Sequence, residues 1–354
     1  MKIAQIMPEF GLAGAEIMCE NLTYELRKAG HEVVVVSMYD YHSAITERLE
    51  AAGVELRDLG KKPGLDPSMI LKMHRVFRET GVQVVHTHRY CAQYAMPAAM
   101  LAGVPHRIHT LHSLAPKENK KPARKLSKFF YKHCHVVPVS LSKAVQESVV
   151  EEYGLEHSAI PVIFNGINLS KCIRKEDYAV EGNFQILHIG RFSEEKNHLG
   201  LLKSFQKFYA NHPDSELWLI GDGNLRPAAE KYARENGLED AVKFLGLQSN
   251  VYGYMHDADV FALPSTYEGI PMTLIEAMGT GLPVVASRVG GIPDMMDDNS
   301  ALLVPVDADA VAEAFEKYYC DEALRQKNGM AAADRAAQFS SRVMAEQYQK
   351  VYSM

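Results

Sequence analysis

The chain has 354 residues, of which 47% are hydrophobic and 23% charged, and its formal net charge is −6. That length indicates two domains of ordinary size, and the composition is typical of a soluble globular protein. The net negative charge argues against nucleic acid as the main partner. The five cysteines have no metal-binding spacing and cannot pair completely, so we expect reduced thiols, most of them buried.

The first residues of the chain, MKIAQIM before Pro8, hold too few apolar side chains for a signal peptide. No run approaches the roughly 18 apolar residues of a membrane-spanning helix. The sequence therefore predicts a cytoplasmic protein that acts on or near the molecule it modifies.

Strand and helix patterns alternate through the first half of the chain. KIAQIM predicts a buried strand, residues 14–29 predict a helix that ends at Gly30, and HEVVVVSM predicts a strand rich in β-branched residues. Further strands are expected at 82–88, 106–112 and 135–140. Short apolar strands that alternate with helices indicate a parallel sheet covered on both faces.

The second half repeats this plan, with a strand at 184–190 and a helix near 196–211. Strands are also expected at 216–223, 242–246, 259–265 and 282–287. Asn165-Gly166 is a strong turn signal and marks the domain boundary. The predicted fold class is α/β, with two Rossmann-like, doubly wound parallel-sheet domains. Such sheets bind ligands at the carboxyl ends of their strands, so the expected site is a cleft between the domains.

Two loops at predicted strand ends suggest anion binding. In PEFGLAGAE, Gly11 and Gly14 allow a close backbone approach at a helix N-terminus, although an ordinary glycine turn fits equally well. In GRFSEEKNH, Arg191 and Lys196 could grip a diphosphate. The alternative for the second loop is a solvated segment in which Glu194 and Glu195 pair with these cations.

The stretch EGIPMTLIEAMG, which begins at Glu268, follows the strand expected at 259–265. Pro271 suits the first turn of a helix running to about Met278. Glu268 would lie in the loop with Gly269, and Glu276 on the side of the helix. Both carboxylates could accept hydrogen bonds from ligand hydroxyls, while the amides near Met272 and Thr273 hold phosphate. The alternative is a helix with an acidic N-terminus, which the macrodipole favours.

Four histidines lie near strand ends in the first half: His86, His88, His109 and His112. Without HExxH or a cysteine partner, a metal site is disfavoured. A single cleft histidine such as His112 could act as a hydrogen-bonding or electrostatic residue, whereas His86 and His88 could equally be structural. The two DAD segments, at 257–259 and 307–309, are interpreted as structural, the second as helix caps.

Residues 117–135 carry seven Lys or Arg and one acid, with aromatic residues among them. This segment could lie on anionic lipid as an interfacial helix, although a solvated helix face fits equally well and Pro122 interrupts its early part. The candidate residues for membrane or acceptor contact are Lys120, Lys121, Arg124, Lys125 and Lys128. With these residues, the predicted localisation is the cytoplasm, with association at the inner face of the membrane.

Taken together, the motifs resemble the retaining glycosyltransferases of glycosyltransferase family 4, which have the GT-B fold. The resemblance runs through most of the chain and is densest over 184–304. It is carried by GLAGAE, VVHTH, HTLHS, VSLSKAV, VIFNGIN, GRFSEEKN, FLG, ADVFALPSTYEGIPMTLIEAMGTGLPVVAS and GGIPDM. No single motif is sufficient, but the combination is specific.

The resemblance implies a role for each candidate residue. Arg191 and Lys196 would neutralise the diphosphate of a UDP- or GDP-linked sugar, and Glu268 would contact the sugar hydroxyls. Glu276 would bind the ribose, and His112 would lie near the sugar. The remaining residues implied to bind the donor are Gly14, Gly246, Gly269, Met272 and Thr273.

The same resemblance implies which domain binds which substrate. The N-terminal domain, residues 1–166, would bind the acceptor and would include a last helix at 339–354 that crosses back onto it. The C-terminal domain, 167–338, would bind the nucleotide sugar. The sequence departs from the family where Asn168, Pro271 and Asp294 replace the usual Asp, Gly and Glu.

The predicted function is transfer of a sugar, with retention of configuration, to a hydroxyl of a glycan or lipid-linked acceptor in surface polysaccharide or glycolipid synthesis. Protein cations and helix amides would stabilise the leaving diphosphate, so neither metal nor cofactor is expected. The alternatives are a nucleotide-sugar epimerase of the same fold and a non-catalytic scaffold subunit of a polysaccharide assembly complex.

Overall fold

The structure is a computed structural model that describes residues 1–11, 14–39 and 42–354. The chain divides into two compact units, which are described separately. Unit 1 comprises Met1–Ile167 with Ser341–Met354, and unit 2 comprises Asn168–Ser340. Leu12 and Ala13, which belong to the GLAGAE motif, lie outside the described residues.

Unit 1 is built on a parallel sheet with strand order β3-β2-β1-β4-β5-β6. Its strands are β1 (Lys2–Met7), β2 (Glu32–Ser37), β3 (Glu55–Asp58), β4 (Val84–His88), β5 (His106–Leu111) and β6 (Val136–Ser140). Its helices are α1 (Gly14–Lys28), α2 (Ala44–Ala51), α3 (Ser68–Thr80), α4 (Ala92–Leu101), α5 (Ala115–Glu118), α6 (Lys121–His133), α7 (Lys143–Tyr153) and α15 (Ser341–Tyr352).

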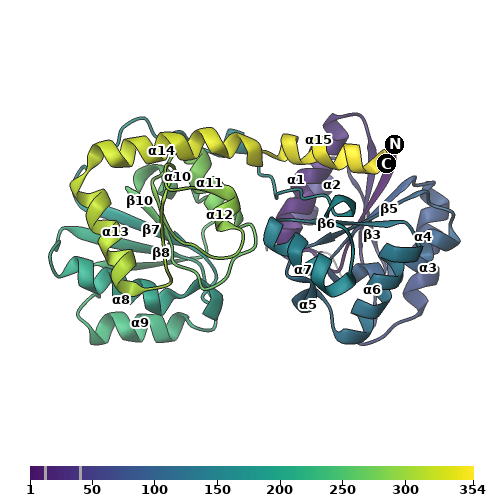
Figure 1. The fold of residues 1–354 in the computed structure, drawn as a ribbon, viewed down its shortest axis with the longest axis horizontal. Helices are drawn as coiled ribbons and strands as arrows, with labels where there is room; N and C mark the ends of the chain where they lie inside the picture. Colours follow the sequence, from purple (N-terminus) through teal and green to yellow (C-terminus); the bar gives the residue numbers. More distant parts are fainter. Residues whose placement is uncertain (12–13, 40–41) are drawn as a thin grey trace. The chain divides into compact units, whose positions relative to one another are not determined.

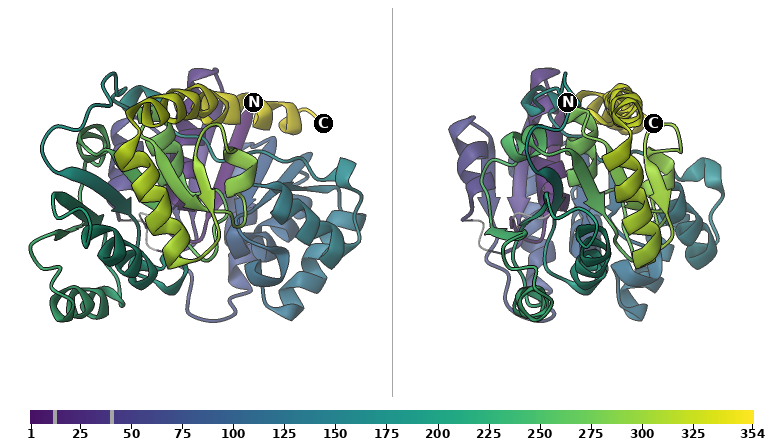
Figure 2. Two further views of the ribbon diagram at one scale, coloured as in Figure 1. Left: turned by 60° about the vertical axis from the view of Figure 1, so that its left-hand side comes forward. Right: turned by 90° about the vertical axis from the view of Figure 1, so that its left-hand side faces the viewer.

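Helices cover both faces of the unit 1 sheet (Figures 1 and 2). On one face, Ala4, Ile6 and Val85 form a core with Met73 of α3 and Tyr94 of α4. On the other face, α15 packs beside α1 (Figure 1). The chain end therefore belongs structurally to unit 1, although it is remote in sequence from the rest of that unit.

Unit 2 is built on a second parallel sheet with strand order β12-β11-β10-β7-β8-β9. Its strands are β7 (Phe184–Ile189), β8 (Ser215–Ile220), β9 (Val242–Gly246), β10 (Val260–Leu263), β11 (Val284–Ser287) and β12 (Leu302–Val304). Its helices are α8 (His198–Tyr209), α9 (Arg226–Glu235), α10 (Tyr252–Asp257), α11 (Met272–Thr280), α12 (Ile292–Met295), α13 (Ala308–Cys320) and α14 (Glu322–Ala336).

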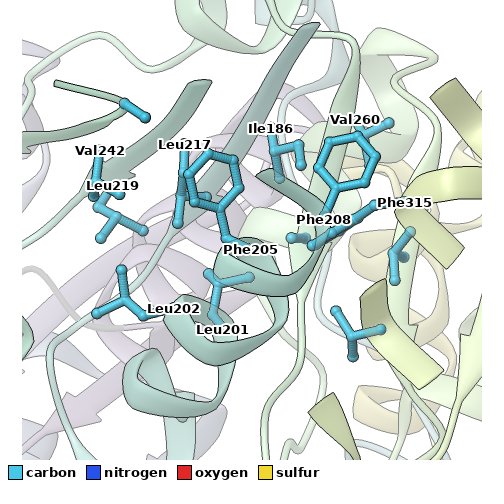
Figure 3. Close-up of a cluster of buried hydrophobic side chains, with 14 of the residues drawn as sticks. Ile186, Leu201, Leu202, Phe205, Phe208, Leu217, Leu219, Val242, Val260 and Phe315 are labelled. Atoms are coloured by element: carbon cyan, nitrogen blue, oxygen red, sulfur yellow. The ribbon is translucent and has the colours of Figure 1, made fainter. Parts of the chain in front are cut away.

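The main core of unit 2 lies between one face of its sheet and helices α8, α9 and α13. Figure 3 shows how Ile186, Leu217 and Val260 of the strands meet Phe205 and Phe208 of α8. All five residues are buried. Burial of this much apolar surface is the main force that fixes the strands and so the loops at their ends.

Strands β3 and β12, both at sheet edges, are absent from the elements that the sequence pattern indicates. β3 has the sequence ELRD and is mostly exposed. β12 is three residues long and only half-buried. Edge strands bury little apolar surface and therefore lack a clear hydrophobic pattern.

The strand orders create one switch point in each sheet. In unit 2, β7 pairs with β8 on one side and β10 on the other. In unit 1, β1 pairs with β2 and β4 in the same way. In open α/β sheets, ligands bind at such a switch point, outside the carboxyl ends of the strands. Among the described helices, none combines the length and apolarity needed to cross a membrane.

Candidate active site

The loop after β7 places Arg191 at the carboxyl edge of the unit 2 sheet. The amide of Gly190 donates to Ile220 O at 3.0 Å, and the amide of Phe192 donates to Asp222 O at 3.0 Å. Gly221 has φ +138°, and a Cβ there would lie 2.0 Å from Gly190 O, so only glycine permits this approach. The Arg191 side chain is exposed, and no carboxylate of the described residues contacts it.

Lys196 forms an ion pair with Glu268 across the switch point. Its Nζ lies 2.7 Å from Oε1 of Glu268, and Ser265 Oγ donates to the same oxygen at 2.6 Å. Glu268 is buried, with 7% of its surface exposed. Lys196 thus pairs with this glutamate from another strand end, not with Glu194 or Glu195 beside it in sequence.

The backbone between Lys196 and α8 explains this pairing. Glu194–Lys196 form a short 3-10 turn, and Asn197 follows with φ +55°, a left-handed conformation that asparagine tolerates. The Asn197 side chain donates to Pro264 O at 3.0 Å and accepts from Gly200 N at 3.2 Å. Asn197 therefore caps α8 and joins the β7 loop to the β10 loop, which brings Lys196 to Glu268.

A glycine pair holds the backbone of Glu268 in place. The amide of Gly291 donates to Glu268 O at 3.1 Å. A Cβ at Gly290, which has φ +54°, would lie 1.8 Å from Glu268 O, and one at Gly291 would lie 2.1 Å from Gly269 O. Gly290 and Gly291 therefore support the backbone of a candidate site residue. The two adjacent glycines in GGIPDM are the sequence signal for this approach.

Helix α11 begins one residue later than expected, because Pro271 is its N-cap and Met272 its first residue. No side chain caps the helix. The amides of Met272 and Thr273 have no intrahelical acceptor, and they lie at the positive end of the helix dipole. Thr273 Oγ1 is buried without a partner among the described residues. This helix end can accept an anion.

Glu276 lies in the second turn of α11, in surroundings different from those of Glu268. Burial raises its pKa to about 7, although the Tyr252 hydroxyl, which donates to Oε1 at 3.2 Å, and nearby Lys171 oppose the rise. The helix packs closely on the segment that contains Leu169 and Cys172, since a Cβ at Gly279 would lie 2.7 Å from Cys172 Sγ. Near neutral pH, the Glu276 carboxyl group is therefore present in both its protonated and its charged form.

Gly246 ends β9 at the same carboxyl edge. Its φ is +66°, and its carbonyl accepts from Gly221 N at 2.8 Å. The structure thus brings Arg191, Lys196, Glu268, Gly269 and the start of α11 to the ends of adjacent strands. Gly246 lies further along that edge.

The other two expected site residues, Gly14 and His112, belong to unit 1. Gly14 begins α1, and His112 directly follows β5. His112 Nε2 lies 3.1 Å from Nδ1 of His88. Burial, with the nearby His109 and Arg89, lowers the pKa of His112 to about 3, so the imidazole is neutral at physiological pH.

The other three histidines of the predicted group, His86, His88 and His109, are buried within the sheet. His86 contacts Tyr352 and Thr110 at 2.7 Å each. His109 contacts Thr87 at 2.9 Å and stacks on Tyr131. His86 and His109 are therefore structural, whereas His88 contacts His112 directly.

The basic segment forms α6, and Pro122 is its second residue. Proline is tolerated there, so it starts the helix and does not interrupt it. Arg124 is mostly buried and pairs with Glu152 at 2.9 Å, which removes it from the exposed basic face. The exposed candidates are Lys120, Lys121, Lys125 and Lys128. Leu126 and Phe129 are exposed beside them.

The aspartates of the DAD segments have structural contacts. Asp259 accepts from the Gln185 amide at 2.8 Å, and Asp307 caps α13 by accepting from Asp309 N and Ala310 N. Asp309 is not a cap but lies in the first turn of α13, where it pairs with Lys207. Among the described residues, no group of three or more His, Cys, Asp or Glu could hold a metal ion.

Two protein-family models match the sequence of this chain. The protein-family model described as "Glycosyl transferases group 1" matches residues 171–335. The family model described as "Glycosyltransferase Family 4" matches residues 12–171. Together the two matches run through both units.

Curated relatives have related names. An Escherichia coli UDP-Gal:alpha-D-GlcNAc-diphosphoundecaprenol alpha-1,3-galactosyltransferase is 28% identical over 64% of this chain, a match that spans 63% of the relative's own length. The N-acetyl-alpha-D-glucosaminyl L-malate synthase of Bacillus anthracis is 25% identical over 96% of this chain and 94% of its own.

Among solved structures, Anabaena HepE in complex with UDP and glucose has the same fold. Its TM-score is 0.85 at 20% identity, with coverage of 100% of this chain and 99% of that one. The fold, the two family matches and the curated relatives together place the chain among the GT-B glycosyltransferases.

Proposed function

We propose that this protein is a retaining enzyme of glycosyltransferase family 4. It would transfer a sugar from a UDP- or GDP-linked donor to a hydroxyl of a glycan or lipid-linked acceptor. The observation that carries the proposal is the Lys196–Glu268 pair at the switch point of unit 2, on the same sheet edge as Arg191 and the N-terminus of α11. This arrangement offers cations, amides and a carboxylate to one ligand.

The donor would be divided among these groups by their chemistry. The diphosphate suits the Arg191 guanidinium, the Lys196 ammonium and the amides of Met272 and Thr273. Glu268 Oε1 already accepts hydrogen bonds from Lys196 and Ser265. Oε2 accepts no hydrogen bond from the described residues, so it could accept one from a sugar hydroxyl. The names of the galactosyltransferase relative and of the HepE complex both include UDP, which supports a uridine donor.

Glu276 is proposed to bind the ribose. A carboxylate accepts from two vicinal hydroxyls, and only its charged form can do so with both oxygens. The raised pKa means that the ribose would complete the ionisation of Glu276 as it binds. His112 is proposed to contact the sugar and the Gly14 loop to approach the diphosphate.

The barrier to transfer is departure of the nucleoside diphosphate, which gains negative charge as the glycosidic bond breaks. Arg191, Lys196 and the α11 amides would stabilise that charge, and such preorganised groups often supply the largest catalytic term. We propose front-face attack, in which the leaving phosphate helps to take the acceptor proton and configuration is retained. Because protein groups supply the positive charge, the proposal includes neither metal nor cofactor.

The acceptor would bind unit 1, near a membrane. Support comes from the exposed lysines of α6 beside Leu126 and Phe129, a combination suited to an anionic lipid surface. The diphosphoundecaprenol in the galactosyltransferase relative's name supports a lipid-linked acceptor. We propose that the protein works in the cytoplasm at the inner membrane face, in polysaccharide or glycolipid synthesis.

Thermal-shift measurements with a panel of UDP- and GDP-sugars test the proposal, because a ligand that binds the folded form raises its melting temperature. The preferred donor is then incubated with and without lipid-linked acceptors. Transfer with retained configuration supports the proposal. Interconversion of the donor sugar without acceptor would indicate an epimerase, and donor binding without turnover would indicate a scaffold subunit.

A further inference from the structure

The face of the unit 1 sheet beneath α15 carries a row of polar side chains. Side chains alternate along a strand, and parallel neighbours in register share a face. Gln5 is in register with His86, and His88 with Thr110, so the four lie on one face across three strands. All are fully buried and need hydrogen-bond partners.

One branch of contacts connects this row to His112. His112 Nε2 lies 3.1 Å from His88 Nδ1, and His88 Nε2 lies 2.8 Å from Gln5 Oε1. The Gln5 amide nitrogen donates to the hydroxyl of Tyr352, in α15, at 3.3 Å. The branch therefore runs from the C-terminal helix to the carboxyl edge of the sheet.

A second branch continues from Tyr352. Its hydroxyl lies 2.7 Å from His86 Nδ1, and His86 Nε2 lies 2.7 Å from Thr110 Oγ1. Thr110 Oγ1 lies 2.8 Å from the hydroxyl of Tyr348, also in α15. Tyr348 and Tyr352 are fully buried, so both hydroxyls depend on these partners.

Gln5 gives the chain of contacts a direction. Its Oε1 can only accept and its amide nitrogen can only donate, whereas each imidazole and hydroxyl can do either. With Oε1 of Gln5 facing His88, as it does in the structure, His88 carries its proton on Nε2 and accepts at Nδ1. His112 must then donate from Nε2, which leaves its Nδ1 unprotonated. No described residue forms a hydrogen bond with that nitrogen.

We propose that Tyr352, Gln5 and His88 are positioning residues that hold His112 as the Nε2-protonated tautomer, with Nδ1 presented to accept a hydrogen bond from a donor-sugar hydroxyl. The sugar contact rests on the proposed function, but the tautomer does not. Through Tyr352, helix α15 thereby determines which nitrogen of His112 donates and which accepts, although the two residues are more than 200 positions apart in the sequence. The neutral state of His112 agrees with its lowered pKa.

Two-bond proton–nitrogen NMR of the full chain, labelled with ¹⁵N-histidine, reads the tautomer directly. His112 and His88 are assigned by His112→Gln and His88→Gln. In the wild type, both should be protonated at Nε2. Protonation of His112 at Nδ1 would overturn the proposal without reference to any variant.

Two variants and a matched control test the chain of contacts. Tyr352→Phe leaves the Gln5 amide without its acceptor, and Gln5→Leu removes the acceptor of His88. Each should let His112 populate both tautomers. Tyr348→Phe removes an equally buried hydroxyl from the same helix but leaves the branch to His112 intact, so its His112 signals should be unchanged. If Tyr352→Phe fails to fold, as judged by circular dichroism, Gln5→Leu decides alone. A His112 tautomer that stays fixed in the folded variants overturns the proposal.

Transfer assays separate this proposal from the proposed function. kcat should fall roughly tenfold in Tyr352→Phe and Gln5→Leu, the scale of one hydrogen bond, and should be unchanged in Tyr348→Phe. A lost tautomer preference with undiminished kcat would overturn the sugar contact. A wild type that transfers no sugar would overturn the proposed function, whereas the NMR result would still decide the tautomer.

Discussion

Lys196 Nζ lies 2.7 Å from Oε1 of Glu268, and this pair joins the loops after β7 and β10. Only 9% of the Glu268 side chain is exposed, so the ammonium is the main compensation for a carboxylate removed from water. The two residues therefore position each other as well as offering groups to a ligand. A variant of either one affects stability and binding together.

Lys196→Ala should lower transfer about 100-fold, because it removes a charge aimed at the leaving diphosphate. It should also lower the melting temperature, since Glu268 loses its partner. The double variant Lys196→Met with Glu268→Gln removes both charges and should recover stability without recovering transfer. Lys203→Ala, an exposed lysine of α8, is the control and should change neither. Recovery of transfer in the double variant would contradict a role for Lys196 in catalysis.

The affinity for a nucleotide sugar should rise as the pH increases from 6 to 8. The pKa of Glu276 is about 7, and hydroxyls that donate to the carboxylate favour its charged form. Protonation competes with binding below that pKa, by up to about tenfold per pH unit. Calorimetric titration with an intact nucleotide sugar avoids the terminal phosphate ionisation of a free nucleotide. Glu276→Gln should bind weakly with little pH dependence; an unchanged pH profile would exclude Glu276 from the site.

Gly290→Ala should destabilise the protein and reduce transfer. The new Cβ would lie 1.8 Å from Glu268 O, and its φ of +54° disfavours any other residue. Gly253→Ala is the matched control, since a Cβ there meets no atom within 4 Å and the residue lies in α10. The control should be neutral or stabilising by up to about 1 kcal/mol. Equal melting temperatures for the two variants would show that the close approach is unimportant.

Unit 1 should lose stability in mild acid. Burial lowers the pKa of His109 to about 4 and, with His109 and Arg89, that of His112 to about 3, and it holds those of His86 and His88 well below the ordinary value. The same groups titrate near pH 6.5 in an unfolded chain. Between pH 6.5 and about 4 the unfolded state therefore binds more protons, and the free energy of unfolding falls as the pH falls. Hydrogen exchange in β4 and β5, corrected for intrinsic rates, should show this; constant protection would contradict it.

The exposed face of α6 should bind anionic vesicles. Charge reversal of Lys121, Lys125 and Lys128 should weaken sedimentation with phosphatidylglycerol vesicles, and salt should have the same effect. The control reverses three exposed lysines of unit 2: Lys203, Lys317 and Lys327. Equal binding to neutral vesicles, or equal loss in the control, would count against a membrane role for α6.

The sequence predicted the architecture well where strands are buried. The apolar runs at β1, β4, β7 and β10 placed the central strands, and with them Arg191 and Glu268 at strand ends. The pairing of β7 with β10, which makes those two ends neighbours, came from the structure. It did not predict β3 and β12, whose exposed or very short sequences carry little periodicity. The GT-B arrangement and the roles of single residues came from the family resemblance.

Pairings between distant residues could not be predicted from the sequence. Glu194 and Glu195 are the obvious partners for Lys196 by proximity, but the left-handed Asn197 redirects the chain so that Lys196 meets Glu268. The contact between His88 and His112 depends on the pairing of β4 with β5, and Arg124 pairs with Glu152 of α7. Such contacts depend on tertiary structure, which local patterns do not encode.

Sugar transfer by Arg191→Ala is the sharpest test of the proposed diphosphate site. The Arg191 side chain is exposed and contacts no carboxylate of the described residues, so its removal should leave stability unchanged. Arg234→Ala, an exposed arginine of α9, is the control. At saturating donor, Arg191→Ala should transfer sugar at least about 100-fold more slowly than the wild type while Arg234→Ala transfers normally. Undiminished transfer by a folded Arg191→Ala variant would contradict a role for Arg191 in the departure of the diphosphate.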